Sequence, residues 1–158
     1  MLKRLHPEYF KNLVFGIEDS VVSTVGVLFG LATAAMDRGT IFTTGLIVIS
    51  VEAISMGIGS YLSEESTQEI DGQTHKDKPA IEGIIMFCSY YFAGFIPLLP
   101  YVFFDIRSAK FLSVTVALVT LFLVGFIPRK KAKSGIKMAV LAGFAIFIGF
   151  AVGKFLKL

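Results

Sequence analysis

A carboxylate and a thioether stand one helical turn apart inside an otherwise apolar stretch of this chain. The stretch reads VEAISMGIGSYLSEES, and it places Glu52 four residues before Met56. On a helix, residues four apart lie on the same face. Carboxylates bind hard and borderline divalent cations, and a thioether adds selectivity for softer ions such as Fe²⁺ over Mg²⁺. The pair therefore predicts a site for a divalent metal ion.

A second acidic residue, Asp19, begins a similar pattern in FGIEDSVVSTVGVLFGLA, where Ser23, Gly26 and Gly30 follow it at helical spacing. Glycine lets helix backbones approach closely, so two such stripes can pack together and present their ligands to one space. The expected metal ligands are Asp19, Met56 and Glu52. The expected lining of the pathway beside them is Ser23, Ser55 and Gly59.

Helix packing alone is the competing explanation for these stripes, and it fits Ser23, Ser55 and the glycines well. It fits Asp19 poorly, because an aspartate at the centre of a membrane costs about 2.5–3.5 kcal/mol on insertion scales. Helix packing explains Glu52 better than Asp19 but less well than the serines, so Glu52 is either a ligand or a structural group. Gly149 and Gly153, four residues apart near the end of the chain, are expected to form only a packing contact.

The ligands of one chain are too few to surround a metal ion. A site shared across a two-fold axis would double them, with water completing the shell. A carboxylate in a low-dielectric pathway can also exchange a bound proton for a metal ion. Together these features predict a proton-coupled carrier of divalent metals that acts as a homodimer.

The elements that must position these residues are membrane-spanning helices. Hydrophobic residues make up 54% of the 158-residue chain and charged residues 17%, against about 25% charged in a typical soluble domain. A helix needs about 20 mostly apolar residues to cross a bilayer. The fold class is therefore an all-α integral membrane bundle in a single domain, residues 1–158. The five expected spans are 13–36, 40–63, 82–104, 111–127 and 138–156.

The Lys and Arg residues predict the orientation of the bundle. With a cytoplasmic N-terminus, ten of the 15 Lys and Arg residues fall on the cytoplasmic side, as expected for membrane proteins. The C-terminus is then outside or luminal, and residues 64–79 form a cytoplasmic loop. Acidic side chains of this loop are the candidate cytoplasmic entrance for cations, although they also fit an ordinary solvated loop. These are Glu64, Glu65 and Glu69.

Four motifs resemble the vacuolar iron transporter-like family and together cover nearly the whole chain. They read NLVFGIEDSVVSTVGVLFGLA at 12–32, EAISMGIGSYLSEES at 52–66, GFIPLLPYVF at 94–103 and GFAVGKFL at 149–156. The resemblance implies a five-helix homodimer that moves Fe²⁺, and often Mn²⁺, out of the cytosol in exchange for protons. It also implies that the ion path runs at the dimer interface, lined by the residues that match here as Asp19 and Met56.

The chain departs from the family pattern at three places. Members often have Asn-Asp-Gly where this chain has Glu18–Asp19–Ser20, and many have Glu where this chain has Ser60. Iron transporters of the family that carry a cytosolic metal-binding domain insert it between the second and third helices. This chain has a short connection there, so the resemblance is to a short form, and Mn²⁺ or another divalent ion becomes a plausible cargo besides Fe²⁺.

The expected partners are a second copy of the chain, membrane lipid, divalent metal ions and protons, but no nucleic acid. Fe²⁺ or Mn²⁺ is the transported substrate, and no permanently bound cofactor is expected. The membrane would be the cell membrane in a prokaryote or that of a vacuole-like organelle in a eukaryote. Two alternatives remain, a non-transporting scaffold subunit and a proton-coupled carrier of a small organic solute. An enzyme is not expected, because His6 and His75 lie outside the spans and no nucleophile–base pair is apparent.

Overall fold

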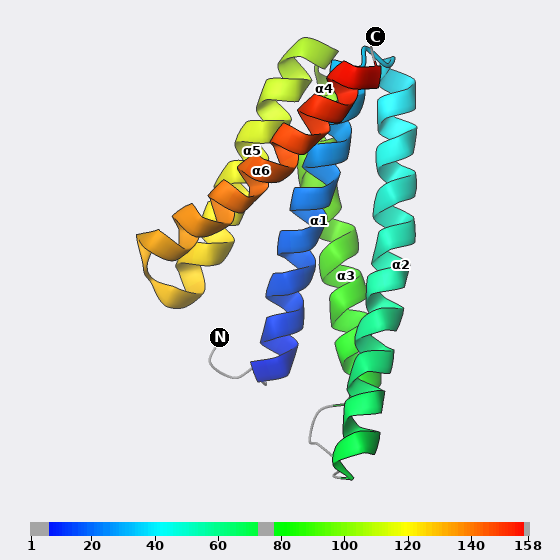
Figure 1. Cartoon of the computed structure of the whole chain (residues 1–158), viewed down its shortest axis with the longest axis vertical. Helices are drawn as coiled ribbons and strands as arrows, with labels where there is room; N and C mark the ends of the chain where they lie inside the picture. Colours follow the sequence, from blue (N-terminus) through cyan, green and yellow to red (C-terminus); the bar gives the residue numbers. More distant parts are fainter. Residues whose placement is uncertain (1–6, 73–77, 157–158) are drawn as a thin grey trace.

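The computed structural model describes residues 7–72 and 78–156, and within them the chain is helical with no strand. Five of its helices are long and apolar enough to cross a membrane, which confirms the all-α fold with five spans. α1 begins at the end of the molecule opposite to that at which α6 ends (Figure 1). The helices are α1 (Pro7–Thr33), α2 (Arg38–Asp71), α3 (Pro79–Leu98), α4 (Pro100–Phe103), α5 (Ile106–Arg129) and α6 (Ala132–Leu156).

Three helices run alongside one another, and a hairpin of two more crosses them. α3 packs against both α1 and α2, whereas α1 and α2 share a smaller contact. α5 and α6 form the hairpin, which meets α1 near one end of the molecule and diverges from it toward the turn between α5 and α6 (Figure 1). α1 and α3 run in one direction, and α2 runs in the opposite direction (Figure 1).

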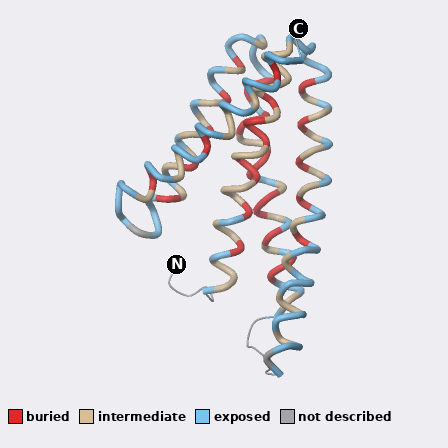
Figure 2. The backbone as a smooth tube through the Cα atoms, in the orientation of Figure 1, coloured by how far each residue is buried: buried red, intermediate tan, exposed pale blue. Residues whose placement is uncertain are grey.

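The core lies where α1 meets its neighbours, and the outer faces of the helices are exposed (Figure 2). Val21 and Val25 of α1 pack with Leu121 of α5 in one buried cluster. Leu28, Ile49 and Leu98 join α1, α2 and α3 in another. Large apolar side chains are exposed along α2, α5 and α6. Such surfaces suit a bilayer, where lipid rather than water surrounds the protein.

The second helix is longer than the sequence predicts. The sequence predicts that the second helix ends at residue 63 and that residues 64–79 form a loop. The prediction is wrong for the first part of this loop, because α2 continues to Asp71. The residues after Ser63 are polar but contain no helix breaker before Gly72, which ends the helix with a φ of 61°. The end of an apolar run shows where a helix leaves the hydrocarbon of the bilayer, but it does not show where the helix itself ends. Glu64, Glu65 and Glu69 are therefore helical, and residues 73–77 of the predicted loop lie outside the described residues.

The third predicted span, 82–104, is divided. α3 ends at Leu98, and the short α4 begins at Pro100. Proline lacks the backbone N–H that would continue the helix, so the chain changes course there. The first, fourth and fifth helices begin before the predicted spans, at Pro7, Ile106 and Ala132, and the first ends earlier, at Thr33.

The glycine stripe of α1 packs against α6 rather than α2. A Cβ atom added to Gly149 would collide with the carbonyl oxygen of Gly26, and one added to Gly153 with that of Gly30. This close crossing confirms Gly149 and Gly153 as a packing contact. It also corrects the expectation that the glycines of the first helix face the second. A Cβ atom added to Gly59 of α2 would have no atom within 4 Å, so this glycine does not face a close helix contact either.

Candidate functional site

Three helices meet at the carboxylate of Glu52. The hydroxyl of Ser23 from α1 donates a hydrogen bond to Glu52 Oε2 at 3.1 Å. The hydroxyl of Tyr90 from α3 donates to the same oxygen. The two hydroxyl oxygens lie 2.7 Å apart, so the three side chains form one connected group. We call this group of Ser23, Glu52 and Tyr90 the Glu52 junction.

Local packing holds the Glu52 junction in place. The hydroxyl of Ser20 donates to the backbone carbonyl oxygen of Tyr90 at 2.6 Å, which ties α1 to α3. Ser20 is fully buried and Tyr90 is 1% exposed. A tyrosine can be buried in this way because its hydroxyl finds partners. Glu52 itself is half-buried.

The hydrogen bond between Ser23 and Glu52 sets the register of α1 against α2. One turn from Ser23 toward the start of α1 is Asp19, and one turn from Glu52 toward the end of α2 is Met56. Because the two helices are antiparallel, Asp19 and Met56 occupy the same level of the bundle. Asp19 is half-buried and close enough to Glu52 for their charges to interact. The same step on α3 leads from Tyr90 to Met86.

A polar groove of about 830 Å³ begins at this level and extends toward the start of α1. α1 and α2 form its sides, and α3 contributes Glu82 and Met86. Glu8, Lys11 and Glu64 line its outer part, where Lys11 and Glu8 form a surface ion pair of 3.0 Å. Of the residues predicted from the sequence, the groove is lined by Ser55, Met56, Gly59 and Glu64.

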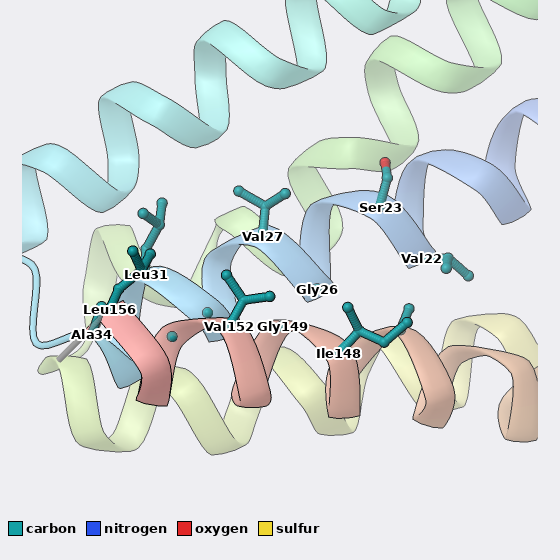
Figure 3. Close-up of a pocket in the computed structure, with 13 residues that line it drawn as sticks. Val22, Ser23, Gly26, Val27, Leu31, Ala34, Ile148, Gly149, Val152 and Leu156 are labelled. Atoms are coloured by element: carbon teal, nitrogen blue, oxygen red, sulfur yellow. The ribbon is translucent and has the colours of Figure 1, made fainter. Parts of the chain in front are cut away.

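The remaining predicted residues lie elsewhere. Asp19 and Glu52 do not line the groove but stand beside its inner end. Glu65 accepts a hydrogen bond of 2.7 Å from the hydroxyl of Tyr61 on the same helix, and Glu69 is exposed. Ser23 borders a second, almost wholly apolar crevice of about 430 Å³ between α1 and α6. In Figure 3, Val22, Ser23 and Gly26 lie on α1 and Ile148 lies on α6, and the hydroxyl of Ser23 points away from α6.

Glu82 and Met86 are groove residues that the sequence analysis did not assign to the site. Both are buried, with exposures of 4% and 2%. The side-chain amide of Asn12 donates to Glu82 Oε2 at 2.7 Å across the contact between α1 and α3. A signal for them existed, because Glu82 and Met86 repeat the four-residue spacing of Glu52 and Met56. The groove thus receives thioether sulfur from two helices, α2 and α3.

The donors gathered here are a mixture of carboxylate, hydroxyl, amide and thioether groups. Within residues 7–72 and 78–156, no three His, Cys, Asp or Glu side chains form a cluster that could hold a metal ion. Mixed oxygen and sulfur donors suit a borderline divalent ion such as Fe²⁺.

Comparison with known proteins places the chain in a family. The VIT family model matches residues 10–77 and 67–154. The chain is 28% identical over 131 residues to vacuolar iron transporter homolog 4 of Arabidopsis thaliana, an alignment that covers 75% of this chain and 66% of the relative. It is thus aligned with just under two thirds of that protein.

Two further relatives align over most of the chain. Vacuolar iron transporter 1 of Oryza sativa subsp. japonica is 22% identical over 214 residues, covering 93% of this chain and 85% of the relative. The vacuolar iron transporter of Toxoplasma gondii is 22% identical over 227 residues, covering 96% and 75%. Both alignments are longer than this chain's 158 residues, so the relatives carry inserted segments. This chain is a multi-pass membrane protein and belongs to the VIT family.

Proposed function

We propose that this chain carries divalent metal ions, Fe²⁺ or Mn²⁺, out of the cytosol in exchange for protons. The observation that carries the proposal is the register set by Ser23 and Glu52, which brings Asp19 and Met56 to one level beside the polar groove. Membership of the VIT family, whose relatives are named iron transporters, supports metal as the cargo.

The groove is the access route in this proposal. Among the described residues, its outer part carries Glu8 and Glu64 against the single cation Lys11, and this excess of negative charge attracts cations toward the inner end. There the ion meets the thioether of Met56 and then the carboxylates of Asp19 and Glu52. A thioether is a weaker ligand than a carboxylate, so the ion is held firmly enough to enter but not so firmly that it cannot leave. The excess of Lys and Arg residues predicted for the side of the N-terminus supports a groove that opens to the cytoplasm.

Proton exchange follows from the two neighbouring carboxylates. Asp19 and Glu52 repel each other when both are ionised, and a bound proton or a divalent cation relieves that repulsion. Because metal ligands must be deprotonated, binding of the metal releases the proton. Delivery of protons from the far side then displaces the ion, which gives antiport.

A second copy of the chain completes the site. Around the level of Asp19 one protomer contributes two carboxylates and the thioethers of Met56 and Met86, which is fewer than the about six ligands of an octahedral shell. Asp19 is half-buried and stands beside the open groove, on a side of α1 that the protomer leaves partly uncovered. A two-fold axis along this side would double the ligands.

Transport by purified protein in liposomes tests the proposal. Fe²⁺ under anaerobic conditions and Mn²⁺ are added in turn, with a pH-sensitive dye inside the vesicles. We expect metal uptake with proton movement in the opposite direction for the wild type and for the adjacent control Glu18→Gln. Uptake should be abolished in Asp19→Asn. A dimeric wild-type preparation that moves neither metal would contradict the proposal and favour a scaffold that uses these stripes for assembly.

A further inference from the structure

We propose that Tyr90 is a positioning residue for metal transport, which holds Glu52 in the orientation that the ion requires. The inference rests on the proposed function and assigns a role to a residue on α3, outside the two helices that carry the predicted ligands. Tyr90 acts through Glu52 and has no contact with the ion.

Tyr90 is held at both of its ends. Its backbone carbonyl accepts the 2.6 Å hydrogen bond from Ser20 of α1. Its hydroxyl reaches across to Glu52 of α2 and to Ser23 of α1. The ring between them is buried, with 1% of the residue exposed. A side chain constrained in this way can fix the position of whatever its hydroxyl binds.

The hydrogen bonds at the Glu52 junction are unevenly shared between the two carboxylate oxygens. Oε2 accepts from both Tyr90 and Ser23. Oε1 accepts no hydrogen bond from the described residues, so it is the oxygen available to a cation. Carboxylates that bind metals are themselves oriented by hydrogen bonds, and loss of such a partner typically lowers metal affinity about 10- to 100-fold.

Tyr91 provides a matched comparison on the same helix. Its ring packs against Phe87 and Phe95, with ring centres 5.8 Å and 5.3 Å away. Its hydroxyl makes no hydrogen bond within the described part of the chain. Removing the hydroxyl of Tyr91 therefore tests a general effect of losing a tyrosine hydroxyl on α3, whereas removing that of Tyr90 also releases Glu52.

The experiment compares Tyr90→Phe with Tyr91→Phe in the liposome assay and in equilibrium binding of Mn²⁺ to purified protein. For Tyr90→Phe we expect the KM for metal and the Kd for Mn²⁺ to rise about tenfold. For Tyr91→Phe both should remain at the wild-type value. Ser23→Ala, which removes the other donor to Oε2, should raise KM in the same direction, and Ser23→Thr should restore it.

A double variant separates positioning from a structural effect. If Tyr90 acts through Glu52, then Tyr90→Phe combined with Glu52→Gln should have the same KM as Glu52→Gln alone. Full additivity of the two changes, or a Tyr90→Phe variant equal to Tyr91→Phe in a transporting preparation, would overturn the inference alone. A wild-type protein that moves neither metal would overturn the proposed function and the inference with it.

Discussion

The side chains of Asn12 and Glu82 join the first part of α1 to the first turn of α3 through a hydrogen bond of 2.7 Å. Both residues are buried, and both line the polar groove. The carboxylate of Glu82 therefore stands along the route that the proposed function assigns to the ion, one turn from the buried Met86.

Replacing Glu82 separates its charge from its packing. We expect Glu82→Gln to keep a hydrogen bond with Asn12 but to raise the KM for metal several-fold, because the groove loses a buried negative charge. Glu82→Ala should also destabilise the protein by about 1–3 kcal/mol, since the amide of Asn12 loses its partner. Transport assays and thermal unfolding in detergent measure the two effects. A Glu82→Gln variant with an unchanged KM would show that the charge of Glu82 takes no part in attracting the ion.

The close crossing of α1 and α6 makes Gly149 sensitive to substitution. Gly149→Ala places a methyl group against the carbonyl oxygen of Gly26, and we expect a loss of about 1–3 kcal/mol in stability from overpacking. Gly143 on the same helix is the matched control, because nothing lies within 4 Å of an added Cβ there. Gly143→Ala should leave the unfolding temperature unchanged or slightly raised. Equal effects of the two substitutions would argue against the crossing.

The orientation of the bundle is testable by cysteine labelling. Cys88 is the chain's single cysteine, so Cys88→Ala provides a background without thiols. In that background we expect Lys131→Cys, in the turn between α5 and α6, to react with a membrane-impermeant maleimide only after the membrane is permeabilised. Arg107→Cys, at the other end of the bundle, should react in intact cells. The reverse pattern would place the N-terminus outside and contradict the orientation predicted from the basic residues.

Asp37 and Asp105 are the N-caps of α2 and α5, and their carboxylates make the stability of the fold depend on pH. A side-chain hydrogen bond from Thr40 lowers the pKa of Asp37, and a backbone hydrogen bond from Ser108 lowers the pKa of Asp105. A carboxylate with a lowered pKa stabilises the folded state above its unfolded pKa of about 4, and this stabilisation is lost as the pH falls through the folded value.

The double variant Asp37→Asn and Asp105→Asn should therefore lose less thermal stability than the wild type between about pH 5 and pH 3. Asparagine remains a good N-cap, so both helices should still begin at Arg38 and Ile106. The measurement is the unfolding temperature in detergent across this range. Parallel curves for the two proteins would show that neither carboxylate contributes to the acid response.

The five spans could be recognised from the sequence alone, and so could the helix face that Glu52 shares with Met56. Lipid requires long apolar helices, so composition and segment length were sufficient to recognise them. The four-residue spacing of Glu52 and Met56 was likewise enough to place both on one face of a helix. The apolar pattern could not show where α2 ends, because the pattern stops at Ser63 whereas the last turns of the helix are polar.

Which helix covers each face depends on how the helices pack in three dimensions. Gly26 and Gly30 would fit any closely packed helix, and the fold pairs them with α6 instead of α2. Tyr90 is one aromatic residue among several on α3, yet the register between helices brings its hydroxyl to Glu52. Periodicity reports which residues share a face, whereas the neighbour that meets that face depends on how all the helices pack together.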